Sequence, residues 1–355
     1  MRVQNRNIAI ICAAGMLLLI LDSKTALYGA TEGIDMCISA LIPSLFPFFV
    51  LSIILTGALS GQVIKCLQPV GDICKMPPGT EYILAIGFLG GYPVGAHSIS
   101  QLSQQGKLTD LQAMRLLAFC NNAGPSFIFG VLGSMFSSPI ISWLLWCVYL
   151  LSALLVGIFL PSTECKSGIQ TQIGVVRFTD ALSRAVKVQA VVCGWVVFMR
   201  IVLAYMEKWV FHFFPVSIQI ILSGLLELSN GCIRLAELDR EGLRFLIACA
   251  LLSLGGICVT LQTASAANGI SMRMYFPGKA LQCCFCTLLG CLFQFAFPIC
   301  ARCSWIIPAA ISTILIVLIT LYLRFPKKEV EFPDPLMYNG RNITKEVSSC
   351  CFGNE

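Results

Sequence analysis

Long apolar runs separated by short polar connections constrain this chain more than any other feature. A helix that crosses the hydrocarbon core of a bilayer needs about 20 mostly apolar residues. Eight runs approach that length: residues 8–21 extended to about 30, 38–59, 114–136, 140–160, 186–205, 243–263, 281–297 and 306–323. Residues 82–99 and 210–228 form two further runs, each interrupted by glycine, proline or a charged residue. The sequence therefore predicts an all-α polytopic membrane protein with about eight full spans.

The charge content supports the same class. Only 12% of the 355 residues are charged and 57% are hydrophobic, whereas a soluble domain carries about 25% charged residues. The formal charge of +6 comes from scattered lysines and arginines, so no basic face predicts a nucleic-acid partner. No small-residue cleavage site follows Leu21. We therefore expect a retained first helix, an integral membrane location and the lipid bilayer as the principal partner.

Nineteen cysteines raise the question of a metal or disulfide site. Most lie inside apolar runs, where a thiol behaves as a small hydrophobic group. The strings "CCFC" (283–286) and "CARC" (300–303) have no second CxxC and no nearby histidine to complete a tetrahedral site. The sequence thus predicts no metal site and no cofactor.

The order of segments is repeated in the two halves of the chain. An interrupted segment begins at Gly87 ("GFLGGYPVGAHSISQL") and a second begins 137 positions later at Gly224 ("GLLELSNGC"). Each is followed by a polar connector and then by a helix with a polar interruption, "FCNNAGPSF" and "LGGICVTLQTAS". The predicted organisation is a membrane helix (1–36), two repeats (37–162 and 163–280), further membrane helices (281–323) and a polar tail (324–355).

Matched interruptions in tandem halves are typical of a transporter's binding site. An interrupted helix exposes backbone donors at membrane depth, and its N-terminus favours a carboxylate or phosphate. We predict a substrate site made from the interruptions and the polar residues beside them. Its predicted residues are Gly90, Gly91, Tyr92, Pro93, Gly95, Asn121, Asn122, Pro125, Glu227, Asn230, Gly255, Gly256, Gln262 and Ser265.

Simpler explanations remain open for several of these residues. Glycines also allow membrane helices to pack closely, and Glu227 could be an interfacial residue at a helix end. A carboxylate at membrane depth costs several kcal/mol, which favours a functional role. His97 could be linked to proton movement or could lie at the membrane interface. The chain contains no catalytic triad pattern, HExxH, phosphate-binding loop or paired catalytic carboxylates, so we do not expect an enzyme.

At these motifs the sequence resembles a known family. The strings "LIPSLFPFFVLS", "GFLGGYPVGA", "LLAFCNNAGPSFIFGVLG", "GLLELSNG" and "LGGICVTLQTAS" are similar to those of the YlbJ-type sporulation integral membrane proteins. The resemblance runs from about residue 40 to residue 279. It implies two pseudo-symmetric nucleoside-recognition (Gate) repeats with interrupted or re-entrant helices, as in concentrative nucleoside transporters.

The resemblance also implies a function in spore formation. The best understood family member is associated with moving dipicolinic acid across the outer forespore membrane. We therefore expect a transporter of a small anionic metabolite, with dipicolinate as the leading substrate. A nucleoside or nucleobase transporter and a non-transporting scaffold in spore assembly are the alternatives, and the sequence leaves a homo-oligomer open.

Overall fold

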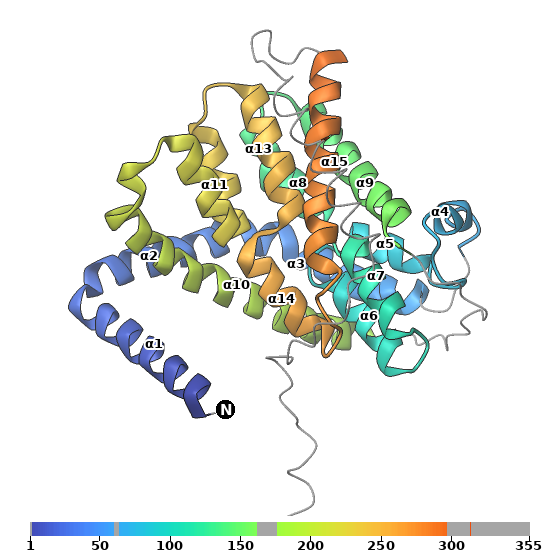
Figure 1. The fold of residues 1–355 in the computed structure, drawn as a ribbon, viewed down its shortest axis with the longest axis horizontal. Helices are drawn as coiled ribbons and strands as arrows, with labels where there is room; N and C mark the ends of the chain where they lie inside the picture. Colours follow the sequence, from blue (N-terminus) through green and yellow to red (C-terminus); the bar gives the residue numbers. More distant parts are fainter. Residues whose placement is uncertain (1, 60–63, 162–175, 297–312, 314–355) are drawn as a thin grey trace, which may run out of the picture. The chain divides into compact units, whose positions relative to one another are not determined.

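The computed structural model describes residues 2–59, 64–161, 176–296 and 313, and within these ranges all regular structure is helical (Figure 1). The helices of the first half are α1 (Arg2–Leu21), α2 (Ser23–Met36), η1 (Cys37–Leu41), α3 (Ile42–Leu59), α4 (Gln68–Ile73), α5 (Tyr82–Leu89), α6 (Val94–Gln104), α7 (Asp110–Cys120), α8 (Pro125–Gly130), η2 (Leu132–Met135) and α9 (Pro139–Phe159). Those of the second half are α10 (Phe178–Trp209), η3 (Phe211–Phe213), α11 (Val216–Leu226), α12 (Leu228–Ile233), η4 (Arg234–Glu237), α13 (Glu241–Leu254), α14 (Gly256–Ala267) and α15 (Tyr275–Ala296).

Five helical stretches in the described part of the chain are long and apolar enough to cross a membrane. They are Ser23–Leu59, Pro139–Phe159, Phe178–Trp209, Glu241–Ala267 and Tyr275–Gln294. The all-helical membrane class is therefore confirmed, whereas eight full spans are not found. The expected span at 306–323 lies outside the described residues except for Thr313, and the tail from 324 lies outside them entirely.

The N-terminal region differs from the expected pattern of two spans separated by a polar loop. Residues 31–37 continue the helix, and α2 passes through the π-helical turn η1 directly into α3. The polar stretch can stay helical because Arg200 of α10 forms an ion pair with Glu32. Gly29 and Gly33 lie against the α10 backbone, where a Cβ at Gly29 would come within 2.9 Å of the Arg200 carbonyl oxygen. Small residues spaced by four favour such close helix packing.

Two of the eight spans counted as full in the sequence are interrupted at the polar motifs within them. The expected span 114–136 ends as α7 at Cys120 and resumes as α8 at Pro125. The expected span 243–263 changes direction at Gly255, which has a left-handed φ of +74° and separates α13 from α14. Apolar content alone could not reveal these ends, because the residues on both sides of each interruption are equally apolar.

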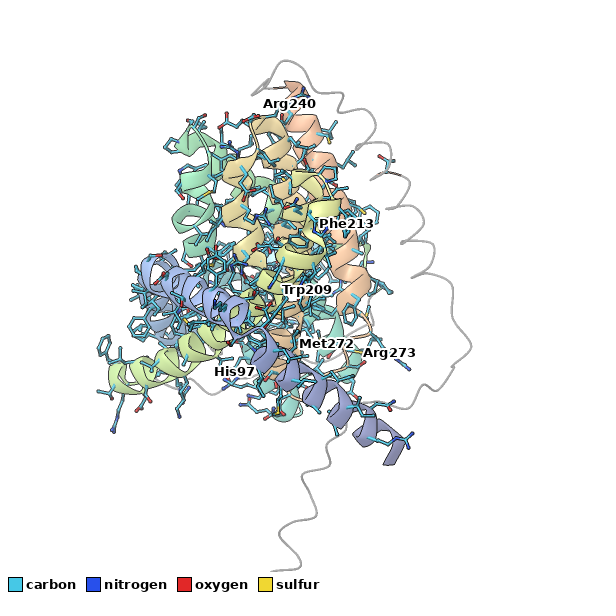
Figure 2. The ribbon with its side chains drawn as sticks, turned by 90° about the vertical axis from the view of Figure 1, so that its left-hand side faces the viewer. His97, Trp209, Phe213, Arg240, Met272 and Arg273 are labelled. Carbon is cyan, nitrogen blue, oxygen red and sulfur yellow. The ribbon has the colours of Figure 1, made fainter. Side chains whose placement is uncertain are left out.

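The helices pack in two directions. α15 packs against α13 on one side and α9 on the other, and these three helices run side by side (Figure 1). The long helix α10 crosses this group and packs along α2 and α3. Arg240, before α13, and Arg273, before α15, lie toward opposite ends of the body (Figure 2). α13–α14 and α15 therefore run in opposite directions between these ends.

The outer surface suits a lipid environment. Large apolar side chains remain exposed, including Ile20 (74% exposed), Ile140 (73%) and Phe213 (74%), and Figure 2 shows Phe213 and Trp209 on the outside of the body. Together with the apolar helices, this surface identifies an integral membrane protein.

Lys208 forms a hydrogen-bonded salt bridge with Asp22 in the connection between α1 and α2. The hydrogen bond from Lys208 lowers the pKa of the Asp22 carboxyl group.

The order of elements is the same in both halves. A long helix (α3 or α10) precedes two interrupted helix pairs, and a further long helix follows (α9 or α15). The interrupted pairs are α5/α6 and α7/α8 in the first half, and α11/α12 and α13/α14 in the second. The predicted domain boundaries at 36, 162, 280 and 323 are not tested by this order and stay a prediction.

Candidate functional site

Four helix interruptions form the framework of the candidate site. They comprise residues 90–93 between α5 and α6, residues 121–124 between α7 and α8, Glu227 between α11 and α12, and Gly255 between α13 and α14. Each coincides with one of the polar motifs expected to interrupt a helix. The Tyr92–Pro93 peptide bond in the first interruption is cis.

The first two interruptions lie backbone to backbone. Gly91 has a φ of +74°, and a Cβ there would lie 3.0 Å from the Gly124 nitrogen. A Cβ at Gly95 would lie only 2.6 Å from the Cys120 carbonyl oxygen. Close packing therefore explains part of the glycine motif, and it also brings the freed backbone groups of α5/α6 and α7/α8 together.

A small cavity connects interruptions from both halves. Its volume is about 60 Å³, and we call it the Glu227 cavity. The first half contributes residues from both of its interruptions, and the second half contributes Glu227, the start of α12 and α14. The lining includes Gly90, Gly91, Tyr92, Ala123, Gly124, Glu227, Ser229, Val259 and Gln262. Five of the predicted site residues thus surround one space although they come from distant parts of the chain.

The Glu227 carboxylate holds the N-terminus of α12. Its Oε1 accepts a hydrogen bond from the Ser229 N–H (3.0 Å), and its Oε2 accepts from the backbone N–H of Asn230 (2.7 Å). The Asn230 side-chain amide also donates to Oε2 (2.8 Å). A carboxylate in this position satisfies two helix donors and interacts favourably with the helix dipole. Glu227 is only 2% exposed and lies at a helix end, between α11 and α12, while its depth in the membrane stays a prediction.

Asn121 joins the first half to the second. Its Oδ1 accepts a hydrogen bond from the Ala96 N–H in α6 (3.2 Å), and its Nδ2 donates to Thr263 Oγ1 in α14 (2.9 Å). Asn121 and Thr263 are fully buried. The side chain therefore fixes the interruption at residues 121–124 against two other helices.

Lys279 lies beside the two asparagines. Its Nζ donates to the Asn121 carbonyl oxygen (2.6 Å), to Asn122 Oδ1 (3.2 Å) and to Gln282 Oε1 (2.9 Å). Gln282 Nε2 also donates to Asn122 Oδ1 (3.0 Å). The lysine is 2% exposed and both amide side chains are fully buried. We call Asn121, Asn122, Thr263, Lys279 and Gln282 the Asn–Lys cluster.

Aromatic side chains connect this cluster to the Glu227 cavity. Lys279 Nζ lies 5.5 Å from the centre of the Tyr92 ring and 5.7 Å from that of Tyr275. The Tyr92 hydroxyl is 3.2 Å from the Tyr149 hydroxyl, which accepts a hydrogen bond from the Ala123 N–H (2.8 Å). Because Tyr92 lines the cavity, its ring forms the contact between the cavity and the buried lysine.

The other predicted residues occupy different positions. Pro93 lines a second, larger cavity, and Pro125 is the first residue of α8. The Asn230 side chain donates a hydrogen bond to Glu227. Gly256 packs against the α11 backbone, where a Cβ would lie 2.6 Å from the Gly224 carbonyl oxygen. The structure does not bring Ser265 to the site, because this residue is exposed and lines neither cavity.

Sequence reasoning missed Lys279, Gln282, Thr263 and Tyr149. Lys279 stands just before the predicted span 281–297, but α15 begins one turn earlier, at Tyr275. The spacing of Lys279 and Gln282 by three residues on one helical face was an available signal. Tyr149 lies in an ordinary apolar helix and nothing local marks it, whereas Thr263 lies inside the motif "LGGICVTLQTAS", next to the predicted Gln262.

The described part of the chain contains no group of three potential metal ligands. Cys284 and Cys286 are buried in α15 as free thiols, while the "CARC" string lies outside the described residues. These observations concern the described ranges only, and the prediction that the protein uses no metal or cofactor stays a prediction.

One curated relative supports the family resemblance. The chain is 25% identical over 298 residues to the sporulation integral membrane protein YlbJ of Bacillus subtilis (strain 168). The match covers 70% of this chain and 73% of that protein. The predicted similarity to YlbJ-type proteins is therefore confirmed. No protein-family model matches the chain, and no solved structure matches it.

Proposed function

From the similarity to a sporulation integral membrane protein and the geometry of the four interruptions, we propose that this protein transports a small anionic metabolite during sporulation. Dipicolinate is the proposed substrate, and the outer forespore membrane is the proposed location. The two halves act as pseudo-symmetric Gate-type repeats in this proposal. It involves no chemical conversion of the substrate.

The observation that carries the proposal is the position of the Glu227 cavity. Three interruptions and α14 meet around it, so backbone groups from both halves face the same space. In lipid, interrupted backbone is tolerated only where it is buried in protein or lines a cavity. Binding near the boundary between two repeats is the arrangement used by many secondary transporters.

The cavity is too small for a planar aromatic ligand in this conformation. Ligand pockets usually measure about 300 Å³ or more, against about 60 Å³ here. Transport by this route therefore requires the interruptions to separate, which widens the space between Tyr92 and Glu227. The structure would then correspond to a closed state of the site.

Charge determines how a dianion could bind there. The buried Lys279 amino group lies against the Tyr92 ring, 5.5 Å from its centre, and the separated interruptions supply N–H donors. Glu227 would repel a carboxylate unless it carries a proton or binds a cation that accompanies the substrate. We therefore propose that Glu227 couples transport to a proton or a cation.

The nucleoside alternative rests on Glu227 as well. A neutral nucleoside needs no charge compensation, and its hydroxyl or amino groups can donate to a carboxylate. Purified protein in liposomes should accumulate labelled dipicolinate and not labelled uridine if the first proposal is right. Uptake of uridine alone would replace dipicolinate by a nucleoside.

Two variants test the site itself. Asn121→Ala and Glu227→Ala should each reduce dipicolinate uptake at least tenfold and lower the dipicolinate content of spores, while protein levels stay comparable. Ser265→Ala is the matched control, because Ser265 is exposed and should not affect uptake. Unchanged spore dipicolinate in both site variants, with defects only in helix-packing variants such as Gly29→Leu, would favour the scaffold alternative.

A further inference from the structure

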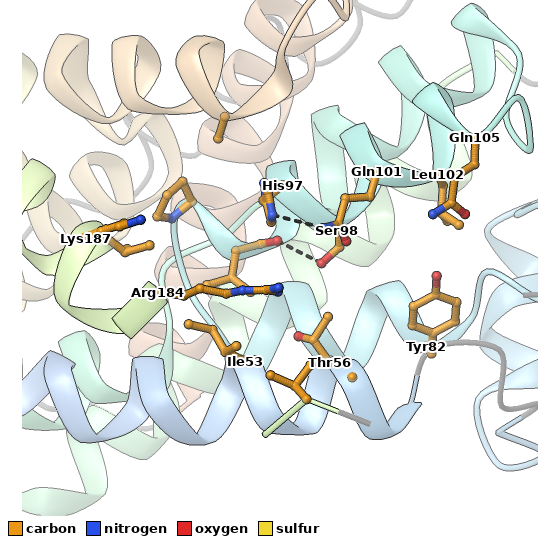
Figure 3. Close-up of a pocket in the computed structure, with 16 residues that line it drawn as sticks. Ile53, Thr56, Tyr82, His97, Ser98, Gln101, Leu102, Gln105, Arg184 and Lys187 are labelled. Carbon is orange, nitrogen blue, oxygen red and sulfur yellow. Dashed lines mark hydrogen bonds between the residues drawn. The ribbon is translucent and has the colours of Figure 1, made fainter. Parts of the chain in front are cut away.

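A second cavity lies on the other side of the first interruption. Its volume is about 470 Å³, which is within the usual size of a small-molecule site. Residues of α3, α6 and α10 form most of its wall, and the lining also includes Tyr82 of α5, Val176 and Ala266 near the end of α14. We call it the α10 cavity (Figure 3).

Two cationic side chains extend into this cavity from α10. Figure 3 shows Arg184 reaching between Ile53 and Thr56 of α3 and His97 and Ser98 of α6, with Lys187 beside it. The two residues are three positions apart, so they share one face of the helix. Neither forms an ion pair with another residue in the described part of the chain, and none of the described lining residues is acidic.

Polar groups on α6 face these cations. His97 Nε2 is 3.2 Å from Gln101 Nε2, and Gln105 lies one turn further along the same wall. The cavity therefore combines two positive charges with neutral hydrogen-bonding groups on the opposite side. This combination suits a small molecule with two carboxylates, because each cation can pair with one carboxylate while amides bind the remaining oxygens.

Consecutive residues of the chain line the two cavities. Gly90, Gly91 and Tyr92 line the Glu227 cavity, while the next two residues, Pro93 and Val94, line the α10 cavity. Five consecutive residues, the first interruption (90–93) and Val94 at the start of α6, thus line one cavity and then the other. In the transport proposal, the substrate passes this segment when the interruptions separate.

We propose that the α10 cavity is an outer binding site for a small dicarboxylate, held by Arg184 and Lys187 before it passes the 90–94 segment. The site deepens the proposed transport function, but binding at it does not depend on transport. Its ligand is selected by two positive charges at an accessible position, whereas the inner site contains the carboxylate of Glu227.

The test measures binding of dipicolinate, and separately of phthalate, to the purified full-length protein in a neutral detergent by titration calorimetry. The double variant Arg184→Gln/Lys187→Gln should weaken binding of both compounds at least tenfold, as expected when charged hydrogen bonds are lost. The matched control Lys24→Gln/Lys65→Gln removes the same charge from two exposed lysines outside the cavity. It should bind within about twofold of the wild type.

A third variant separates this site from the inner one. Glu227→Gln should keep dicarboxylate binding at the α10 cavity even where uptake is lost, since Glu227 lines the inner cavity and not the α10 cavity. Equal binding by the Arg184/Lys187 variant and the wild type would overturn the outer site and leave the transport proposal standing. If every variant keeps normal uptake while the double variant loses binding, the transport proposal is overturned and the binding site stands.

An anionic lipid headgroup could also bind to Arg184 and Lys187, because its phosphate carries negative charge as a dicarboxylate does. Phosphatidylglycerol in mixed micelles is therefore a separate arm of the titration. If wild-type protein binds neither dicarboxylate, or if phosphatidylglycerol binding alone falls in the double variant, the dicarboxylate site is overturned. Competition between dipicolinate and phosphatidylglycerol, with a stronger effect of dipicolinate at low ionic strength, supports it.

Discussion

The interruptions at residues 121–124 and at Glu227 solve the same physical problem differently. Each interruption leaves polar backbone groups without a partner in the helix at a buried position, where each unsatisfied group costs about 1–3 kcal/mol. At the first, distant residues of α14 and α15 satisfy these groups through Thr263 and Lys279. At the second, Glu227 satisfies donors only two and three residues away.

This difference indicates how freely each interruption can move. The Glu227 interruption carries its hydrogen bonds with it, because donor and acceptor belong to one short segment. The 121–124 interruption loses the hydrogen bonds to Thr263 and Lys279 if α7/α8 separates from α14 or α15. We infer that the first half contains the more strongly fixed side of the Glu227 cavity, and that opening involves α11/α12 more easily than α7/α8.

The largest effect is expected from Lys279→Met. This change leaves the Asn121 carbonyl, Asn122 Oδ1 and Gln282 Oε1 without their common donor, and a buried group that loses its partner costs about 1–3 kcal/mol. We expect the free energy of unfolding in detergent to fall by about 3 kcal/mol. Lys24→Met, at an exposed position, is the control. A loss at Lys279 no larger than at Lys24 would contradict the structural function of the Asn–Lys cluster.

Asn121→Ala removes hydrogen bonds to residues far away in the sequence, and Asn230→Ala removes one to a residue three positions away. Comparing the two variants therefore tests the difference between the two interruptions. Asn121 joins α6 and α14, so its loss should cost about 2 kcal/mol. Asn230 supplies one side-chain hydrogen bond to a carboxylate that keeps two backbone donors, so its loss should cost about 1 kcal/mol. Denaturant unfolding of the two variants measures both values. The reverse order would show that the second interruption is the more strongly fixed one.

Gly91→Ala should separate backbone strain from close packing. Gly91 and Gly106 have similar positive φ values, +74° and +69°, but a Cβ at Gly91 meets Gly124 at 3.0 Å while Gly106 faces open space. Both alanine variants carry the cost of a left-handed conformation, about 1 kcal/mol. We expect Gly91→Ala to be destabilised by about 1 kcal/mol more than Gly106→Ala. Equal thermal stability of the two variants would mean that the first two interruptions are not in close contact.

The smallest effect on stability is expected from Glu227→Gln. This variant keeps an oxygen that can accept from the α12 N-terminus and should cost less than about 1 kcal/mol, whereas Glu227→Ala leaves three buried donors without their acceptor and should cost about 3 kcal/mol. Both variants should lose coupled uptake, because neither can carry a proton or bind a cation. Uptake measured with and without a proton gradient checks this separation of stability from transport. Full uptake by Glu227→Gln would exclude proton coupling at this residue.

Much of the architecture could be predicted because membrane physics leaves few choices. Apolar runs must be helical where backbone groups have no water to bind, and glycine, proline and asparagine indicated the four interruptions. The helical continuity from α2 to α3 was missed because the polar stretch around Glu32 is compensated by Arg200 from α10. A partner 168 residues away leaves no local signal.

The sequence alone determined that the chain is a helical membrane protein, that its helices are interrupted at "GGYP", "NNAG", "LELSN" and "LGG", and that Glu227 lies in an apolar setting. These properties depend on composition and on residues within one or two helical turns. Tertiary structure decided that Lys279 and Thr263 satisfy the asparagines, that the interruptions meet around one cavity, and that Arg184 and Lys187 enter a second. Such contacts join residues up to 160 positions apart, and their geometry depends on how whole helices pack.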